Sequence, residues 1–242
     1  MTELFLGLVT FLTSTIAAIV GLGGGMMLIA ILPSFLPINA LIPVHGLTQM
    51  SSNISRAVFG YKDIQYKVIP KFLIGSILGI ALFASIISFI SLEYVPFFIG
   101  SYILLSLWSA KFNDKIKKFE NYYIIGFFQT GLSIVVGATG PLTLTLLFKD
   151  FKDKNKVVVT SAALMSITHI LKVFVFIYFG FVFLDYIGII TAMIIGAVAG
   201  SFLGTKLRNK IDGKKFTIVL KVLLSALAIK LIVDLFIWFK RL

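Results

Sequence analysis

The feature that most constrains this chain is a series of apolar runs, each about as long as a membrane-spanning helix. A helix needs about 20 apolar residues to cross a bilayer. Unbroken runs of that order recur along the sequence, at 40–60, 68–90, 94–110, 156–180, 185–207 and 215–239. Hydrophobic residues make up 59% of the chain and charged residues 13%, against roughly 45–50% and about 25% in soluble domains. The sequence therefore predicts an all-α protein, a polytopic bundle of transmembrane helices.

The positive charge is confined mainly to the connections between these runs. The formal net charge is +12, and most Lys and Arg residues lie in four segments, at 61–71, 111–118, 149–156 and 206–215. Cytoplasmic loops of membrane proteins carry such an excess, so we expect these segments in the cytoplasm. We expect the turns without Lys or Arg outside, at 37–39, 91–93 and 181–184. Because the charge follows membrane topology, nucleic acid is not an expected partner.

The chain has no cysteine and only two histidines. Disulfides and thiolate chemistry are therefore excluded, and neither a dedicated transition-metal site nor a cofactor is expected. No Lys or Arg precedes Arg56, so the N-terminal run lacks the basic segment of a cleaved signal peptide. We interpret that run as the first membrane segment.

Two further apolar runs are interrupted by glycine clusters. The run 4–36 contains Gly-Leu-Gly-Gly-Gly at 21–25, and the run 122–148 contains Gly-Ala-Thr-Gly-Pro at 137–141. Such clusters interrupt helices, which predicts two helical pieces in each run, about 4–20 and 24–36 in the first. The run 122–148 begins and ends beside basic segments, so it is predicted to enter and leave on the cytoplasmic face. Whether the two hairpins are re-entrant or fully crossing stays open.

The same order of features occurs twice: one interrupted run followed by three helices. An offset of 116 residues aligns landmarks of the two halves: Gly21 with Gly137, Gly24 with Gly140, Asn53 with His169, and Arg56 with Lys172. Chance similarity between glycine-rich helices is the alternative. Each half is predicted to cross the membrane an odd number of times, which gives two inverted repeats, a common transporter plan. The repeats are 1–111 and 122–242, and 112–121 is a cytoplasmic linker.

The interruptions place the N-termini of two short helices inside the membrane. Backbone is tolerated there only when it is buried in protein or lines a cavity. Free N–H groups and the positive end of the helix dipole favour an anion, and close packing of small residues is the alternative. The candidate substrate-binding residues of the two interruptions are Gly21, Gly23, Gly24, Gly25, Gly137, Thr139, Gly140 and Pro141.

Polar residues form a stripe on the helix that follows each interruption. Residues three or four apart share one helical face, and polar residues facing lipid are costly, so both stripes should point inward. In the first half the stripe and its flank are His45, Thr48, Gln49, Ser52, Asn53 and Arg56; in the second, Ser161, Thr168, His169 and Lys172. We expect these residues to contact substrate. The alternatives are snorkelling for Arg56 and simple hydrogen bonding for the histidines.

Small residues mark two other helices, with Gly75 and Gly79 in 68–90, and Gly196 and Gly200 in 185–207. At an offset of 121 the first pair aligns with the second. Small residues four apart usually indicate close helix packing, and we interpret these as structural.

The glycine motifs also carry a resemblance to a known family. Gly21-Leu-Gly-Gly-Gly-Met, then Gly46-Leu-Thr-Gln, Asn53 and Gly60-Tyr-Lys-Asp-Ile resemble the first repeat of the TauE/SafE sulfite exporter family, and Gly137-Ala-Thr-Gly-Pro resembles its second glycine motif. The chain differs from that pattern at Thr139 and Pro141, which replace glycines, and at Gln49, which replaces a small hydroxyl residue. The resemblance implies export or exchange of small sulfur oxyanions or organic sulfonates.

Together these observations predict a secondary transporter, a multi-pass permease of the cell membrane whose partners are a small anionic substrate and membrane lipid. A homo-oligomer is a further expected assembly. An anion channel is the first alternative, because it needs the same cationic path. An intramembrane enzyme is the second, although His45 and Ser52 are seven residues apart and poorly placed as base and nucleophile.

Overall fold

The computed structural model describes residues 1–87, 89, 91–111, 121–211 and 213–239, and this part of the chain is helical, without strands. The first half contains α1 (Thr2–Val20), α2 (Gly24–Ile31), α3 (Ile38–Phe59), α4 (Ile69–Ile87) and α5 (Val95–Trp108). The second contains α7 (Tyr122–Val136), α8 (Gly140–Asp150), α9 (Lys154–Tyr178), α10 (Ile187–Leu207) and α11 (Gly213–Phe239). The predicted all-α class is confirmed. Most of the predicted linker, 112–121, lies outside the described residues.

Within the described residues, four helical stretches are long and apolar enough to cross a membrane: Thr2–Val20, Tyr66–Ile87, Lys154–Tyr178 and Phe183–Leu207. α3 has 22 residues, but its polar stripe lowers its mean hydropathy, and it is not among these four. α5 is shorter than the predicted run 94–110: its 14 residues extend about 21 Å at 1.5 Å per residue. That is less than the roughly 30 Å of the hydrocarbon core.

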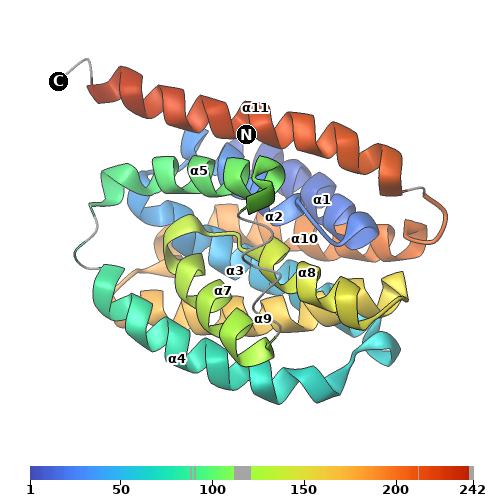
Figure 1. Ribbon diagram of the computed structural model, residues 1–242. Coiled ribbons are helices and arrows are strands. Elements are labelled where there is room, and N and C mark those ends of the chain that lie inside the picture. The colour runs from blue at the N-terminus through green and yellow to red at the C-terminus, as the bar shows by residue number, and fades with distance from the viewer. Residues whose placement is uncertain (88, 90, 112–120, 212, 240–242) are drawn as a thin grey trace.

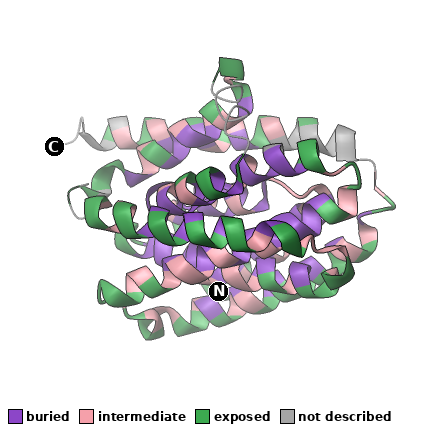
Figure 2. Cartoon of the chain, turned by 60° about the horizontal axis from the view of Figure 1, so that its bottom comes forward, coloured by how far each residue is buried: buried purple, intermediate pink, exposed green. Residues whose placement is uncertain are grey.

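The outer surface of the bundle is apolar and its interior is partly polar. Large side chains such as Leu78, Phe174 and Ile195 are 60–65% exposed, and Figure 2 shows exposed residues along the outer faces of the helices. The side chains of Arg56, Lys172 and Arg208, by contrast, are at most 5% exposed. This distribution suits a protein whose surroundings are lipid and whose polar groups find partners inside.

α3 and α9 pack against each other at the centre of the bundle (Figure 1). α10 packs on α3, and α4 packs on α9. α1 lies along α10, α7 lies along α4, and α5 contacts α11. The helices that follow the two interruptions are thus the innermost ones, and the hairpins α1–α2 and α7–α8 lie around them.

Two helix seams depend on glycine. On α10, a Cβ atom at Gly196 or Gly200 would lie less than 3.0 Å from the carbonyl oxygen of Gly7 or Phe11 on α1. On α4, a Cβ atom at Gly75 or Gly79 would be as close to the carbonyl oxygens of Tyr123 and Phe127 on α7. Real Cβ atoms essentially never come so close. These glycines therefore bring two helix backbones into contact, as their spacing predicts.

Both predicted helix interruptions are present. Gly21 ends α1 with φ of 84°, and Gly23 precedes α2 with φ of 90°. Gly137 ends α7 with φ of 77°. Positive φ is rare for residues with a Cβ atom, so glycine is required at these turns. The first piece beyond the interruption is shorter than predicted, because α2 ends at Ile31 and a 3-10 turn follows over Leu32–Ser34.

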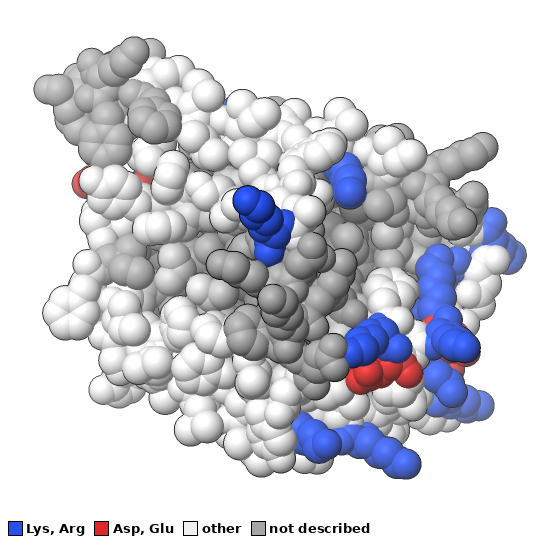
Figure 3. All heavy atoms as spheres, in the orientation of Figure 1, with Lys and Arg blue, Asp and Glu red and all other residues white. Residues whose placement is uncertain are grey.

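The basic connections meet at one end of the molecule. Figure 3 shows Lys and Arg gathered at its right end, where α4 begins and α8 ends in the view of Figure 1. Lys154 Nζ donates to the carbonyl oxygen of Arg208 at 3.3 Å, and the backbone N–H of Gln65 donates to Thr160 Oγ1 at 3.0 Å. The connections before α4, α9 and α11 therefore share one end. The predicted basic segment 111–118 lies almost entirely outside the described residues.

Candidate substrate site

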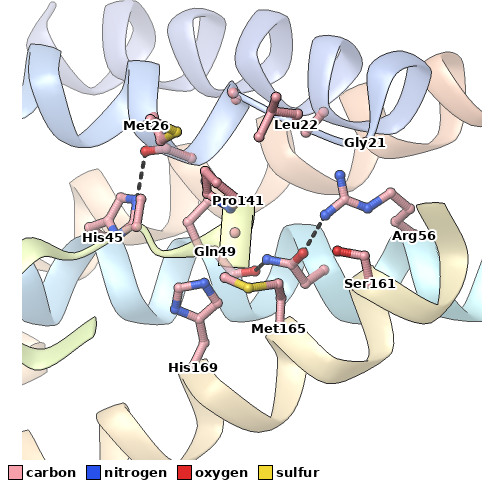
Figure 4. Close-up of a pocket in the computed structure, with 17 residues that line it drawn as sticks. Gly21, Leu22, Met26, His45, Gln49, Arg56, Pro141, Ser161, Met165 and His169 are labelled. Carbon is pink, nitrogen blue, oxygen red and sulfur yellow. Dashed lines mark hydrogen bonds between the residues drawn. The ribbon is translucent and has the colours of Figure 1, made fainter. Parts of the chain in front are cut away.

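A small cavity lies between the two interruptions and the polar faces of α3 and α9 (Figure 4). Its volume is about 40 Å³, whereas one water needs at least about 10–15 Å³. Most of the predicted site residues line it: Gly21, Gly23, Gly24, Gly25, His45, Gln49, Asn53, Arg56, Gly140, Pro141, Ser161 and His169. Residues far apart in sequence thus line one cavity. Apolar lining residues that the sequence analysis did not select are Ala17, Leu22, Met26, Ala138 and Met165.

Arg56 supplies the positive charge of the cavity. Its side chain is 5% exposed, and its Nη2 donates to Asn53 Oδ1. Its Nε and Nη1 atoms are buried without a hydrogen-bond partner. No Asp or Glu belongs to the lining residues. A guanidinium is always charged, and a buried charge without a partner is costly, so a bound anion would stabilise this group.

A second arginine lies close by, and the sequence analysis did not identify it. Arg208 follows the last residue of α10 and is 3% exposed. Its Nε donates to the carbonyl oxygen of Ala18 in the last turn of α1, at 2.7 Å. Cations near a helix C-terminus satisfy its free carbonyl groups. Arg208 therefore anchors α1 at the basic end and adds positive charge near Arg56.

The two histidines both line the cavity and pack edge to face, with ring centroids 5.8 Å apart and an interplanar angle of 72°. His45 Nε2 donates to the carbonyl oxygen of Gly25 at 3.0 Å. The Nδ1 atoms of His45 and His169 are both buried without a partner. One polar atom of each ring is therefore left without a hydrogen bond.

The N-termini of α2 and α8 are not equivalent, although the sequence predicts a matching pair. In α2 the N–H of Met27 bonds to the carbonyl of Gly23, and the N–H groups before it have no partner within the helix. In α8, Pro141 has no N–H, and that of Leu142 donates to the carbonyl oxygen of Thr139. The N–H of Thr143 donates to Gln129 Oε1 at 3.0 Å. α2 therefore offers more free donors than α8.

Gln129 is a polar residue of the site region that sequence reasoning missed. It is fully buried on α7, and its Oε1 accepts from both the backbone N–H and the hydroxyl of Thr143. The hydroxyl of Thr139 donates to its backbone carbonyl at 3.0 Å. A single amide side chain inside the apolar run 122–136 is the signal that could have identified it. Gln129 fixes the second interruption against α7.

The remaining predicted residues lie beside the cavity and do not line it. Lys172 Nζ donates to the carbonyl oxygen of Gly137 at 2.8 Å. The hydroxyl of Ser52 donates to that of Ser14 at 2.9 Å, and the hydroxyls of Thr168 and Thr130 are 3.0 Å apart. The hydroxyl of Thr48 points to Met193 Sδ at 3.9 Å. These side chains, together with Thr139, join the central helices to the elements around them.

The fold and the cavity define a class: a multi-pass helical membrane protein with a small cationic chamber at its centre. The family model described as sulfite exporter TauE/SafE matches residues 6–231, and this chain belongs to that family. The resemblance predicted from the glycine motifs is therefore confirmed, and the chain is a member of a family of membrane transporters. Searches of curated proteins and of solved structures gave no match.

Proposed function

We propose that this chain is a secondary transporter that exports or exchanges a small anion, a sulfur oxyanion or an organic sulfonate, across the cell membrane. The observation that carries the proposal is Arg56, which is buried in the cavity with two unpaired nitrogen atoms and no acidic neighbour among the lining residues. An oxyanion supplies acceptors for these atoms and neutralises the charge.

The surroundings of Arg56 favour an anion further. The free N–H groups at the start of α2 border the same cavity as Arg56, and the positive end of that helix adds about 0.3–2 kcal/mol for a bound anion. An anion that moved alone out of the cell would gain about 2.3 kcal/mol per charge per 100 mV from an inside-negative potential; a proton moved with it would cancel that gain for one charge.

We also infer that the two halves are inverted repeats. The packing partners support this: α1 lies on α10, and α7, its counterpart, lies on α4. Gly75 and Gly79 contact the carbonyls of Tyr123 and Phe127. The two sequence offsets relate this seam to the other one. The offset of 116 relates Tyr123 and Phe127 to Gly7 and Phe11, and the offset of 121 relates Gly75 and Gly79 to Gly196 and Gly200. Gly196 and Gly200 contact the carbonyls of Gly7 and Phe11 in turn. The hydroxyl pair Ser14 with Ser52 likewise matches Thr130 with Thr168 at the offset of 116.

The test is anion flux through the purified full-length protein in proteoliposomes, with sulfite, sulfonates and carboxylates compared. Arg56→Gln keeps a polar side chain and removes the charge, and we expect its apparent KM to rise at least about tenfold, the value of one charged hydrogen bond. Ser55→Ala is the matched control, because Ser55 bonds only within α3, to the carbonyl of Ser51.

Two outcomes separate the alternatives. Saturable flux with counter-flow indicates a transporter, whereas flux that rises linearly with concentration and shows no counter-flow indicates an anion channel. Equal KM values for Arg56→Gln and the native protein would remove Arg56 from the site. Chemical conversion of the anion by the reconstituted protein would instead point to an intramembrane enzyme.

A further inference from the structure

His45 has one committed ring nitrogen and one that lacks a partner. Its Nε2 lies 3.0 Å from the carbonyl oxygen of Gly25. A carbonyl oxygen only accepts, so Nε2 must carry the hydrogen. In a neutral imidazole the other nitrogen is then an acceptor. His45 therefore presents a lone pair at Nδ1, in a buried position without a donor.

His45 lines the proposed anion cavity, and a ring nitrogen that can only accept is in contradiction with a fully deprotonated oxyanion. Two lone pairs facing each other repel, so such an anion cannot bond to a neutral Nδ1. The contradiction disappears when Nδ1 gains a proton, because the imidazolium then donates from both nitrogens. The bond from Nε2 to Gly25 is unchanged by this step, so the first hairpin keeps its position on α3.

The charges around His45 make this proton conditional on the anion. The facing charged and titratable groups come from α9: the ammonium of Lys172, which interacts with the charge of His45, and the ring of His169. Arg56 lies further along α3, and α2 has no charged residue. In an empty cavity, the positive charge of a protonated His45 is repelled by these cations. A bound anion offsets this repulsion, so proton binding and anion binding favour each other reciprocally.

We propose that His45 is the proton site of this transporter, and that each anion is bound and moved together with one proton carried on His45 Nδ1. The inference rests on the proposed anion transport and deepens it by adding a coupled ion. The step is a simple protonation: a proton from water joins the Nδ1 lone pair, and it leaves again when the anion leaves.

The experiment uses the full-length protein in proteoliposomes with a trapped pH indicator, a sulfite gradient and the membrane potential clamped at zero. Liposomes without protein give the background from passive movement of sulfite and its acid. His45→Gln keeps an N–H donor for the carbonyl of Gly25 and removes the titratable nitrogen. Ser166→Ala is the control on the facing helix, because its hydroxyl bonds only to the carbonyl of Ala162.

We expect the native protein and Ser166→Ala to move about one proton for each sulfite above background. His45→Gln should move sulfite more slowly, because it loses a donor to the anion, and its number of protons per sulfite should fall to background. Sulfite flux without proton movement in the native protein would overturn the inference and leave anion transport intact. Undiminished proton movement in His45→Gln would also overturn it, since the proton would then travel on the anion or on another group. Absence of sulfite flux in every sample would overturn the proposed function together with the inference.

Should His45→Gln fail to transport or fold, calorimetry of sulfite binding to the native protein decides. Titrations in two buffers with different ionisation enthalpies give the number of protons taken up per anion, with a titration of sulfite alone correcting for its own protonation. Uptake of about one proton supports the inference, and uptake of none refutes it.

Discussion

The ammonium of Lys172, in the second half of α9, donates a 2.8 Å hydrogen bond to the carbonyl oxygen of Gly137, the residue that ends α7. The two residues are 35 positions apart, and the bond joins a central helix to the second interruption. Lys172 is fully buried, and its side chain also packs against Gly46 on α3. One side chain therefore connects three helices around the cavity.

We expect Lys172→Met to lower the melting temperature of the purified protein, and its anion flux as well. The substitution leaves the carbonyl of Gly137 without its donor, and a buried unsatisfied acceptor costs about 1–3 kcal/mol. Lys172→Arg, which keeps both charge and donors, should lose less. Thermal unfolding in detergent measures the effect, and an unchanged melting temperature for Lys172→Met would show that the bond contributes nothing to stability.

The two glycines at the starts of α2 and α8 should respond differently to added bulk. A Cβ atom at Gly140 would have nothing within 4 Å, whereas one at Gly24 would collide with the backbone of Thr13 on α1. Gly140→Val should fold normally and lose anion flux at least about tenfold, because its side chain enters the cavity. Gly24→Ala should lose folded yield. Size-exclusion profiles and proteoliposome flux measure both, and full flux through Gly140→Val would argue against the cavity as the path.

The seam between α1 and α10 predicts a contrast within one helix. Gly200→Ala places a Cβ atom against the carbonyl of Phe11, whereas the nearest atom to a Cβ at Gly188 is Glu3 Cγ at 3.8 Å, an ordinary contact. We expect Gly200→Ala to destabilise the protein by about 1–3 kcal/mol, the usual cost of overpacking, and Gly188→Ala to change stability little. Equal melting temperatures for the two variants would refute close packing at this seam.

The topology can be tested with single cysteines, because the chain has none. Asn155, at the start of α9, lies at the basic end, and Leu184, in the turn between α9 and α10, is 73% exposed. On the positive-inside rule, an impermeant maleimide added to intact cells should label Leu184→Cys and spare Asn155→Cys. The reverse labelling would invert the assigned orientation.

Sequence reasoning predicted the helix order because apolar length and glycine placement are local properties. Gly21 and Gly137 interrupt helices through their own backbone conformation, which needs no tertiary contact. The polar stripe on α3 was equally readable, since residues three or four apart must share a face. The end of α5 at Trp108 was less so, because neither glycine nor proline marks the extended residue Ser109 that follows it.

The partners of long side chains were not readable from sequence. Lys172 was predicted to contact substrate, yet its ammonium reaches the carbonyl of Gly137. Gln129 takes up the N–H of Thr143 from 14 residues away, which leaves α8 with fewer free donors than α2. Both results depend on which neighbouring helix comes within reach, and that is decided by how α7, α8 and α9 pack against one another. The equal roles expected for the two interruptions therefore do not follow from their similar sequences.

The glycine seams bear on how such a chain could arise in evolution. α1 finds its closest surface on α10, and α7 finds its own on α4, so each seam joins one half of the chain to the other. If the halves are inverted repeats, their ancestor was a protein of half the length. The glycine-bearing face of its seam helix would contact lipid until a second copy, inserted in the opposite orientation, packed against it. Such an ancestor would have to enter the membrane both ways round, and gene duplication followed by fusion would make the antiparallel pair permanent. The two copies could then diverge, as the different donors offered by α2 and α8 show.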